Sequence, residues 1–346
     1  MSQQLIFDNN VAACLQAIIA EQKPGRTFVI ADENTARYTP LTDAETIVMP
    51  AGDVAKNLDT AVFVWQTLSD RAATRHDLVV NFGGGVVTDL GGFCAATYKR
   101  GMPFVNVPTT LLGAVDAAVG GKTGINFGGF KNQVGAFAPA MAVIISTRYF
   151  ATLPPSELLS GYAEMVKHGL LTGMSEFAEL LRFDILNKAA GPEMLDLLAR
   201  SVQVKQRIVE ADPTEKGLRK ALNLGHTVGH ALEELALRAN RPVPHGYAVA
   251  WGLVAAVALS HIRQGLDTKT VHALADFVSA NYPAPAITCD DYDEILALMA
   301  NDKKNTRPGQ ITFTLLRAPG QPVINATATP AEITAALDLM RDLLHI

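Results

Sequence analysis

One stretch of the sequence, RKALNLGHTVGHALEE at residues 219–234, constrains this chain more than any other. If it forms a helix with 3.6 residues per turn, four polar residues fall on one narrow stripe: Arg219, Asn223, His226 and His230. Both flanks of the stripe are apolar or glycine, which predicts a helix that is buried on all sides. Because an unpaired buried polar group costs roughly 2–7 kcal/mol, we expect the stripe to face a polar cavity, a ligand or a metal.

Two glycines interrupt the same stretch. Gly225 and Gly229 each lower the helix propensity by about 1 kcal/mol relative to alanine, so a close approach by another element would explain them. The alternative interpretation of the stripe is a core helix whose histidines find backbone partners. A single histidine would favour that alternative, whereas four polar groups in register favour a functional site.

Length and charge limit the class of protein. A chain of 346 residues predicts two domains, and 49% hydrophobic with 18% charged residues is enough to bury a sizeable core. The net charge of −5 gives no general basic surface for nucleic acid. A small anionic substrate would therefore need a local basic pocket.

The sequence also predicts a compartment. Its three cysteines, Cys14, Cys94 and Cys289, are scattered and odd in number, which favours a reducing cytosol over disulfides or a cysteine zinc site. The first residues, MSQQLIFDNN, lack the pattern of a signal peptide. The longest apolar run, 248–259, is shorter than the ~20 residues that span a bilayer. We expect a soluble cytoplasmic protein with no membrane contact.

The order of the predicted elements indicates an α/β domain followed by a helical one. Short apolar runs at 27–30, 78–82, 104–107 and 142–145 alternate with helical segments such as 58–71, as in a parallel sheet covered by helices. Leu153-Pro154-Pro155 interrupts this alternation, and Ser156 can cap the helix that follows. We therefore expect an α/β domain over 1–152 and a mainly α-helical domain over 153–346, with an entirely apolar helix at 247–260.

Glycine is concentrated in one part of the first domain. Between Gly83 and Gly135 lie 13 of the 27 glycines, and Gly83-Gly84-Gly85 follows a predicted strand directly. Such a turn lets backbone amides approach a phosphate, which fits a pyrophosphate-binding turn. It is not a regular Rossmann fingerprint, because Thr88 stands where glycine or alanine is expected and no acidic residue ends a strand about 20 residues later. The cluster alone leaves dinucleotide binding open.

A second segment carries polar residues among apolar ones. Asp116 interrupts an apolar stretch, and Lys122 sits among glycines as a phosphate-binding lysine would. The segment is not a Walker A loop, because Asp116 stands where the first glycine is required. Lys131 and Asn132 form another polar pair, for which a solvated loop is the alternative.

Three residues form a candidate metal site. One carboxylate and two histidines are a common ligand set for catalytic zinc, and Glu164, His226 and His245 supply it if three helices converge. The alternative for Glu164 is a surface ion pair with Lys167 at i+3. His226 and His230 at i, i+4 could both bind one metal, but no glutamate lies between them as in HExxH. We favour His230 as a proton-transfer or phosphate-facing group.

Basic residues around this set indicate an anionic substrate. Lys122, Lys167, Lys205 and Arg219 are more cations than a neutral substrate would require. A dinucleotide turn, a metal and an anion pocket together indicate redox chemistry on a phosphorylated polyol.

Several segments, in this order and at these spacings, resemble the 3-dehydroquinate synthase family: GGGVVTDLGGF, PTTLL, VDAAVGGKTGIN, KN, SGYAEMVKHGL, LNLGHTVGH and PHGYAVAWG. The resemblance extends from about Asp32 to Lys304, and the motifs are specific together rather than singly. It implies an N-terminal Rossmann-like α/β domain, a mainly helical C-terminal domain and usually a homodimer. It also implies NAD, a divalent metal (zinc, or cobalt in some preparations) and a place in the shikimate pathway to chorismate and the aromatic amino acids.

The resemblance implies roles residue by residue. Glu164, His226 and His245 match the metal ligands of the family, and His230 matches a histidine that handles protons at the phosphate. Arg100 resembles an arginine that reaches the phosphate from the partner subunit, and one of Lys303 and Lys304 closes the pocket. The positions that match substrate-pocket residues are Lys122, Lys167, Lys205, Arg219, Asn223, Asn132 and Asp116.

For NAD, the resemblance implies another set of positions: Asp32, Asn34, Asp53, Lys56, Gly84, Gly85, Asp89, Thr109, Thr110, Lys122 and Lys131. Asp53 departs from the family, which usually has glutamate in Gly-Glu-x-x-Lys at this place. Its side chain is one methylene shorter, which weakens a ribose contact without abolishing it.

The implied reaction converts 3-deoxy-D-arabino-heptulosonate 7-phosphate to 3-dehydroquinate and phosphate. It proceeds by transient oxidation with NAD, elimination of phosphate, reduction, ring opening and an intramolecular aldol closure, with no net redox change. The alternatives are sister cyclases that act on sedoheptulose 7-phosphate, metal-dependent polyol dehydrogenases and a non-catalytic NAD-binding protein. Arg219, Asn223 and His230 favour the dehydroquinate branch, and the intact set of candidate ligands argues against a non-catalytic protein.

Overall fold

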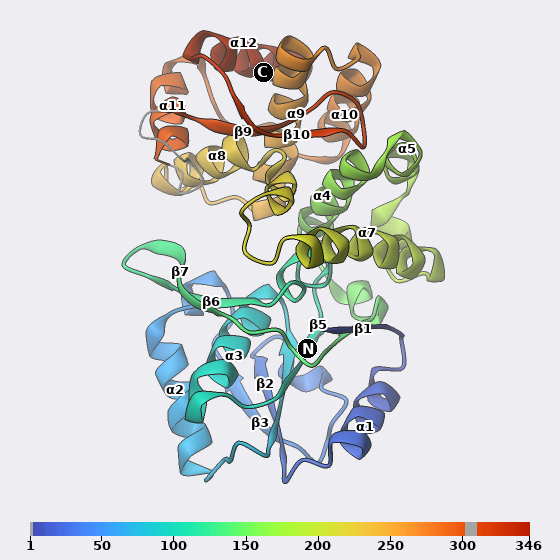
Figure 1. The fold of residues 1–346 in the computed structure, drawn as a ribbon, viewed down its shortest axis with the longest axis vertical. Coiled ribbons are helices and arrows are strands. Elements are labelled where there is room, and N and C mark those ends of the chain that lie inside the picture. The colour runs from blue at the N-terminus through green and yellow to red at the C-terminus, as the bar shows by residue number, and fades with distance from the viewer. Residues whose placement is uncertain (1–2, 302–309) are drawn as a thin grey trace. The chain divides into compact units, whose positions relative to one another are not determined.

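The structure is a computed structural model that describes residues 3–301 and 310–346. Its contacts divide the chain into two compact units (Figure 1). The first comprises Met1–Pro154 and Lys188–Val202, and the second comprises Pro155–Asn187 and Gln203–Ile346. The division by function, with cofactor binding in 1–152 and metal and substrate binding in 153–346, stays a prediction.

A six-stranded parallel sheet forms the centre of the first unit, in the order β1-β8-β5-β4-β2-β3. Its strands are β1 (Gln4–Phe7), β2 (Thr27–Asp32), β3 (Glu45–Met49), β4 (Leu78–Gly83), β5 (Phe104–Pro108) and β8 (Ala142–Ile145). The four apolar runs of the sequence correspond to β2, β4, β5 and β8, so these predictions are confirmed. Every residue of β4 and β5 is buried, because helices cover both faces of a parallel sheet.

Helices of the first unit pack on opposite faces of this sheet. Helix α1 (Val11–Gln22) buries Val11, Leu15 and Ile18 against one face of the sheet. Helix α3 (Gly85–Thr97) packs on the other face, where Gly91 meets the side chain of Asn81. Helix α2 (Leu58–Asp70) packs against α3 and matches the predicted segment 58–71.

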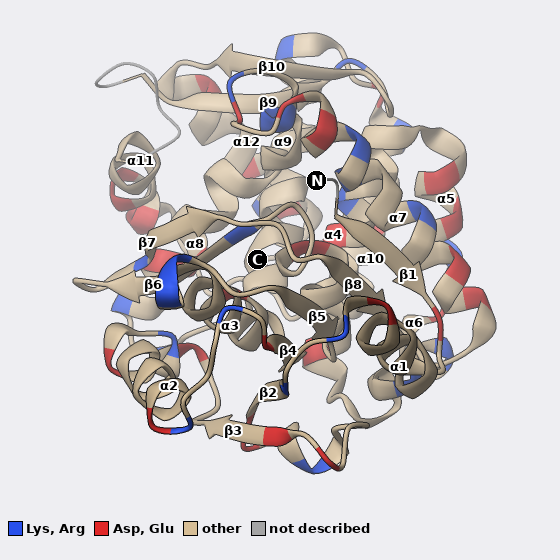
Figure 2. Cartoon of the chain, turned by 60° about the horizontal axis from the view of Figure 1, so that its bottom comes forward, with Lys and Arg blue, Asp and Glu red and all other residues tan. Residues whose placement is uncertain are grey.

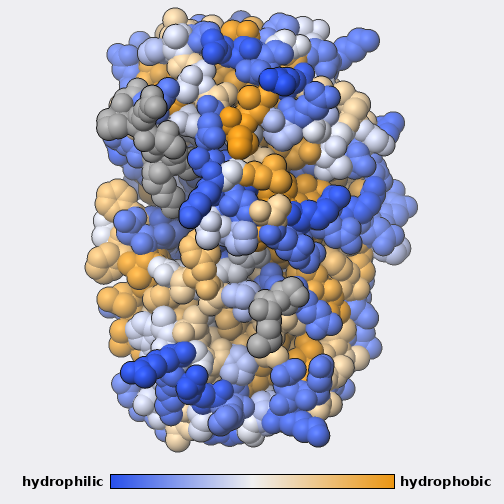
Figure 3. All heavy atoms as spheres, viewed as in Figure 1, coloured by the Kyte–Doolittle hydropathy of each residue, from blue (hydrophilic) through white to orange (hydrophobic). Residues whose placement is uncertain are grey.

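Short elements complete the first unit. Turns of 3₁₀ helix occur at η1 (Ala36–Tyr38), η2 (Asp53–Ala55), η3 (Tyr98–Arg100) and η5 (Arg148–Thr152), and η4 (Gly113–Ala117) is a π-helical turn. Strands β6 (Lys122–Phe127) and β7 (Phe130–Phe137) pair as an antiparallel hairpin. This hairpin exposes Phe127, Phe130 and Phe137 to between 52% and 68%, and lies on the left in Figures 1 and 3.

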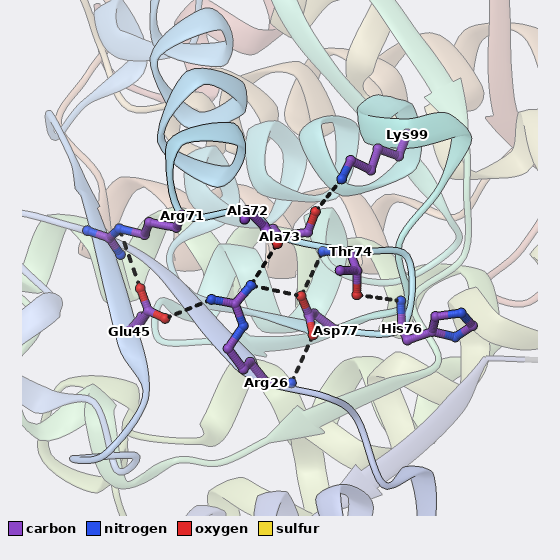
Figure 4. Close-up of polar contacts among 9 residues, drawn as sticks. All are labelled: Arg26, Glu45, Arg71, Ala72, Ala73, Thr74, His76, Asp77 and Lys99. Atoms are coloured by element: carbon purple, nitrogen blue, oxygen red, sulfur yellow. Dashed lines mark hydrogen bonds and ion pairs between the residues drawn. The ribbon is translucent and has the colours of Figure 1, made fainter.

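A polar network ties the loops at the N-terminal ends of β2 and β4 (Figure 4). Asp77 is 2% exposed and accepts hydrogen bonds from the backbone amides of Arg26 at 2.9 Å and Thr74 at 2.7 Å. The Arg26 guanidinium pairs with both Asp77 and Glu45, each at 3.5 Å. These contacts fix the end of the sheet opposite the glycine-rich turn.

The second unit is mainly helical and is built around α9 (His245–Gln264). The other helices are α4 (Pro155–Thr172), α5 (Met174–Arg182), α6 (Ile185–Lys188), α8 (His226–Arg238), α10 (Thr268–Asn281), α11 (Tyr292–Ala300) and α12 (Pro330–Leu343). Helix α7 (Pro192–Ala211) begins in the first unit and ends in the second, and 3₁₀ turns occur at η6 (Leu218–Asn223) and η7 (Cys289–Asp291). Strands β9 (Thr312–Leu316) and β10 (Pro322–Thr327) form an antiparallel pair.

Helix α9 confirms the apolar helix that the sequence predicts, although it begins at His245 rather than 247. Among the described residues it is the one helix long and apolar enough to cross a membrane, but 78% of its most apolar window is buried inside the protein. It is therefore a core helix. Lysine, arginine, aspartate and glutamate lie interspersed on the outer helices instead (Figure 2).

Two local predictions are wrong. The continuous helix over 219–234 is absent, because η6 ends at Asn223 and Gly225 adopts a left-handed conformation, φ 78°, before α8 begins at His226. Arg219 and Asn223 therefore do not share a helix face with His226 and His230. Ser156 does not cap α4, since the helix already begins at Pro155, whose fixed φ suits a first turn.

The glycines of this stretch are explained by close packing, as predicted. A Cβ atom on Gly225 would lie 2.9 Å from Leu253 of α9. A Cβ atom on Gly229 would lie 2.8 Å from the carbonyl oxygen of Ala248, also on α9. Both glycines therefore let α8 and α9 approach each other more closely than alanine would permit.

Candidate metal centre and cofactor-binding turn

Three helices of the second unit bring Glu164, His226 and His245 together. Glu164 lies on α4, while His226 and His245 are the first residues of α8 and α9. The Oε1 atom of Glu164 lies 3.4 Å from Nε2 of His226 and 3.7 Å from Nε2 of His245. The convergence of three helices that the sequence required is thus present.

The separations of these atoms fit ligands of one metal ion. They exceed the usual 2.7–3.2 Å of an N–H···O hydrogen bond. Two ligands of a tetrahedral zinc with bonds of about 2.0–2.2 Å lie roughly 3.4 Å apart. The Glu164 side chain is fully buried, that of His226 is 11% exposed and that of His245 is 28% exposed, so solvent reaches the set from the histidine side.

His230 lies beside the same set. Its ring centroid is 5.3 Å from that of His226 and 5.9 Å from that of His245. One ligand atom from each of the three histidines lies within 4.8 Å of the others. This geometry suits both a third histidine ligand and a proton-transfer group next to the metal.

The second ring nitrogen of each proposed histidine ligand has a partner. Nδ1 of His226 lies 3.1 Å from the carbonyl oxygen of Leu224. Nδ1 of His245 lies 3.0 Å from Oε2 of Glu233 on α8. The sequence analysis missed Glu233, although its position three residues after His230 places it on the same side of α8.

Electrostatics in this cluster set the protonation of the three proposed ligands. Burial raises the pKa of the Glu164 carboxyl, but Lys167 and His226 hold that pKa well below its usual range. Burial lowers the pKa of His226 to about 4, and the Lys167 charge acts in the same direction. Burial also lowers the pKa of His245, but Glu164 and Glu233 outweigh it and raise that pKa to about 10. His226 is thus neutral at neutral pH, while a metal displaces a proton from His245.

The candidate substrate residues of the second unit lie on α4, α7 and η6. Lys167 is 1% exposed and forms an ion pair with Glu164, so this pair is buried and not on the surface. Lys205 and Arg219 are 6% and 3% exposed. The Arg219 side chain donates to the carbonyl oxygen of Pro213 at 2.8 Å.

Asn223 lines a cavity of about 310 Å³ in the second unit. Its amide donates to Oε1 of Glu215 at 3.0 Å. The cavity is also lined by Lys220, Thr227 and side chains of β9 and β10. Asn223 thus lines this cavity from a 3₁₀ turn, but the other three residues of the predicted stripe, Arg219, His226 and His230, are not among its lining residues.

In the first unit, the glycine turn leads directly into a helix. Gly83 ends β4, Gly84 has extended backbone angles, and α3 begins at Gly85 without a side-chain cap. A Cβ atom on Gly84 would lie 3.0 Å from Thr110, and one on Gly85 would lie 3.1 Å from Ala117. The turn therefore presents helix amides at the C-terminal edge of a parallel sheet, the usual place for a dinucleotide phosphate.

The segment after β5 packs against this turn. The Thr109 amide donates to the carbonyl oxygen of Gly83 at 2.9 Å, and Thr110 Oγ1 accepts from the amide of Gly113 at 3.0 Å. Asp116 lies on η4, partly buried. Thr109 and Thr110 are therefore adjacent to the glycines with which the sequence grouped them.

Asp32 and Asn34 lie at the end of the neighbouring strand β2. Oδ1 of Asp32 accepts hydrogen bonds from the Asn34 amide at 3.0 Å and the Thr35 amide at 2.9 Å. Thr35 Oγ1 in turn lies 3.1 Å from the carbonyl oxygen of Phe82 on β4. A hydrogen bond thus connects the turn after β2 to β4, the strand that leads into the glycine turn.

A polar cluster joins η2 to α3 and the β6–β7 hairpin. Lys56 is 5% exposed, and its Nζ lies 2.5 Å from both Asp89 Oδ2 and Asn132 Oδ1. Asp53 lies 3.7 Å from Lys131 and 3.3 Å from Asn126. Asn132, assigned to the substrate by resemblance, lies among residues assigned to NAD.

Sequence reasoning missed Asn126 as a member of this polar cluster. Its Oδ1 also accepts the backbone amide of Asn132 at 2.9 Å. An asparagine between Ile125 and the exposed Phe127 was the available signal.

The remaining candidates occupy exposed positions or lie outside the described residues. Lys122 is the exposed first residue of β6. Arg100 is exposed, with φ 68°, and Gly101 follows it. Lys303 and Lys304 lie outside the described residues.

Solved structures with the same fold define the class of the protein. A 2-deoxy-scyllo-inosose synthase with carbaglucose-6-phosphate, NAD+ and Co2+ matches with a TM-score of 0.83 and 23% identity over 98% of this chain and 96% of that chain. A 2-epi-5-epi-valiolone synthase from Streptomyces hygroscopicus with NAD+ and Zn2+ matches with a TM-score of 0.83 and 27% identity over 99% and 97%. The chain therefore shares its fold with these two synthases, whose structures contain NAD+ and a divalent metal.

Sequence comparison identifies the family within that class. The family model described as 3-dehydroquinate synthase N-terminal matches residues 46–160, and that described as 3-dehydroquinate synthase C-terminal matches residues 161–305. A 3-dehydroquinate synthase from Parabacteroides distasonis is 43% identical over 98% of both chains. One from Pyrococcus furiosus is 44% identical over 67% of this chain and 68% of its own.

The chain belongs to the 3-dehydroquinate synthase family. It is an enzyme of that type, a lyase that eliminates phosphate and closes a ring, and enzymes of this type use NAD and a divalent metal. An iron-containing alcohol dehydrogenase from Corynebacterium glutamicum shares the fold, with a TM-score of 0.64, at only 15% identity.

Proposed function

We propose that this enzyme converts 3-deoxy-D-arabino-heptulosonate 7-phosphate to 3-dehydroquinate and phosphate, with zinc held by Glu164, His226 and His245. One observation carries the proposal: Oε1 of Glu164 lies 3.4 and 3.7 Å from Nε2 of the two histidines. The carboxylate is buried and ionised, His226 is neutral, and both rings direct Nε2 toward the carboxylate. This is a ligand set that catalytic zinc uses, and the metal would displace the proton that His245 carries at neutral pH.

When bound, the metal polarises a substrate oxygen and NAD accepts and returns a hydride. The residues of the chain supply the electrostatics around these groups. Lys167, Lys205 and Arg219 are nearly buried cations, so they attract the anionic groups of the substrate in a medium where charges interact strongly. Arg219 binds a carboxylate or phosphate with two donors, whereas each lysine acts as a point charge.

His230 handles a proton next to this centre. Its ring lies between 5.3 and 5.9 Å from the two proposed histidine ligands, and it is partly exposed. It can therefore exchange protons with the substrate phosphate while the two neighbouring histidines hold the metal. Asn223, at the 310 Å³ cavity, contributes a hydrogen bond that orients the substrate.

NAD binds at the C-terminal edge of the sheet in the first unit. Gly84 and Gly85 bring the amides of α3 to the pyrophosphate. The remaining cofactor residues lie after three strands, on α3 and on the β6–β7 hairpin: Asp32 and Asn34 at the end of β2, Asp53 and Lys56 after β3, Thr109 and Thr110 after β5, Asp89 on α3, and Lys122 and Lys131 on the hairpin. The partly buried Lys56–Asp89 pair holds α3 to η2 and so fixes the helix that carries the glycine turn.

The protein acts as a cytoplasmic homodimer in which Arg100 of one subunit reaches the substrate of its partner. Arg100 and Lys122 are exposed, which is compatible with contacts to a ligand or a second chain. The exposed phenylalanines of the β6–β7 hairpin supply apolar surface for association. Sedimentation of wild type and Phe130→Asp tests this, because a monomeric wild type would contradict it.

The first experiment combines the purified enzyme with the heptulosonate phosphate, catalytic NAD and zinc. Phosphate and NADH absorbance are followed together, with sedoheptulose 7-phosphate as the parallel substrate. We expect many phosphates per NAD, no accumulation of NADH and no turnover of the parallel substrate. Steady NADH formation would indicate a dehydrogenase, and phosphate from sedoheptulose 7-phosphate would indicate a sister cyclase.

A further inference from the structure

We infer that Glu233 is a positioning residue that orients the His245 ring and strengthens it as a metal ligand. The inference deepens the proposed function and rests on it, because it concerns the metal site proposed above. Glu233 is not itself a ligand in this arrangement: it faces the nitrogen of His245 that points away from Glu164.

The geometry fixes the tautomer of His245. Oε2 of Glu233 lies 3.0 Å from Nδ1 of His245, within hydrogen-bond distance. Nε2 of the same ring faces Oε1 of Glu164 at 3.7 Å. An imidazole that donates Nδ1–H to a carboxylate keeps its proton there, so Nε2 presents its lone pair to the metal.

The two proposed histidine ligands differ in what holds them. Nδ1 of His226 faces the backbone oxygen of Leu224, two residues away in the same chain segment. Nδ1 of His245 faces a carboxylate from a different helix, and its side chain is 28% exposed compared with 11% for His226. The His245 ring is the more exposed of the two and lies at the first residue of α9, so it has more freedom to rotate. A fixed hydrogen-bond partner therefore restricts its orientation more than it would restrict that of His226.

The partner also carries a charge. The Glu233 side chain is only 13% exposed, so its negative charge is poorly screened at His245. A carboxylate that accepts the Nδ1 proton makes the ring a stronger donor at Nε2 than a neutral carbonyl does. Loss of such a partner typically lowers metal affinity or activity by about 10–100-fold.

Three substitutions separate these contributions. Glu233→Ala removes the acceptor and the charge, and we expect metal affinity to fall by about 10–100-fold. Glu233→Gln keeps an acceptor of the same size without the charge, and we expect a smaller loss. Glu234→Gln is the matched control: Glu234 is the next residue on α8, its side chain is 45% exposed, and it pairs with Arg238 at 2.9 Å. We expect wild-type affinity there.

The experiment uses full-length protein stripped of metal. Zn2+ affinity is measured by competition with a chromophoric chelator, and the visible spectrum of the Co2+ form reports the ligand field. Circular dichroism and NAD affinity are measured in parallel. We expect Glu233→Ala to bind Zn2+ more weakly and to shift the Co2+ bands, with unchanged helix content and NAD affinity.

The outcomes distinguish failure of the role inferred for Glu233 from failure of the proposed metal site. One outcome would overturn the inference and leave the proposed site intact: Glu233→Ala keeps wild-type Zn2+ affinity and an unchanged Co2+ spectrum, while His226→Ala loses the metal. Equal binding by wild type and His226→Ala would overturn the proposed site itself. If Glu233→Ala does not fold, Glu233→Gln decides: unchanged affinity and an unchanged spectrum would overturn the inference.

Discussion

Replacing Gly252 by alanine tests whether close packing of α8 on α9 forms the metal centre. A Cβ atom on Gly252 would lie 2.1 Å from the carbonyl oxygen of Gly225, and 2.6 and 2.9 Å from the backbone nitrogen and Cα of Gly229. A carbon–oxygen contact needs about 3.3 Å, so the two helices must separate by roughly 1 Å. Neither obstacle is a flexible side chain, so the helices themselves must move.

The displacement acts on the proposed ligands. Gly252 lies seven residues after His245 on the same side of α9, and the obstructing Gly225 directly precedes His226. Metal–ligand distances tolerate only about 0.2 Å, so a separation of ~1 Å removes one histidine from the ligand set. Overpacking costs about 1–3 kcal/mol, and the better helix propensity of alanine returns about 1 kcal/mol of it.

We therefore expect Gly252→Ala to lose at least about tenfold in Zn2+ affinity, with a net fall of roughly 0–2 kcal/mol in metal-free stability. Chelator competition measures the first quantity and urea unfolding of the metal-free protein the second. Gly173→Ala is the control, because its Cβ would meet only the carboxylate end of Glu176 at 3.4 Å. Unchanged Zn2+ affinity in Gly252→Ala would refute the reasoning.

Three further predictions concern single contacts. His226→Ala should lose metal and turnover together while the exposed His272→Ala keeps both; full activity of the metal-stripped His226→Ala variant would refute the ligand assignment. Asp77→Ala should lower the free energy of unfolding in urea by about 2–3 kcal/mol, since it leaves two backbone amides without their charged acceptor. Zn2+ affinity should not change. A loss of stability below about 0.5 kcal/mol would contradict this prediction. Gly91→Ala should lower stability by about 1–3 kcal/mol and weaken NAD binding, because its Cβ would lie 2.1 Å from Oδ1 of the buried Asn81 and push α3 off the sheet. Titration with NAD measures the affinity. A wild-type affinity would show that α3 does not move.

Four of the six strands in the sheet of the first unit follow from the sequence, whereas β1, β3 and the β6–β7 hairpin were not predicted. Runs such as 78–82 and 142–145 are short, apolar and bounded by turn residues, so their period and length specify buried parallel strands. The glycine turn after β4 could also be predicted from the sequence, because a strand that ends in Gly83-Gly84-Gly85 permits few other structures. Local chemistry was sufficient for these elements.

The helix over 219–234 shows where local reasoning fails. The stretch contains the four polar residues that the prediction named, but they do not lie on one helix face. The sequence does not reveal that Gly225 adopts φ 78°. A side chain at this position would collide with Leu253 of α9, a residue far from Gly225 in the chain. His226 and His230 still share α8, whereas Arg219 and Asn223 lie on a separate 3₁₀ turn.

The sequence by itself determined which residue types were available for the metal centre, the alternation of strands and helices, and the family to which the chain belongs. It could propose Glu164, His226 and His245 as ligands because one carboxylate and two histidines are a common zinc set and because these positions match the ligands of the family. Only the tertiary structure decided that Glu233 faces His245 and that Lys56, Asp89 and Asn132 meet. Their positions depend on how helices and loops pack over long sequence separations, and one-dimensional periodicity carries no information about that packing.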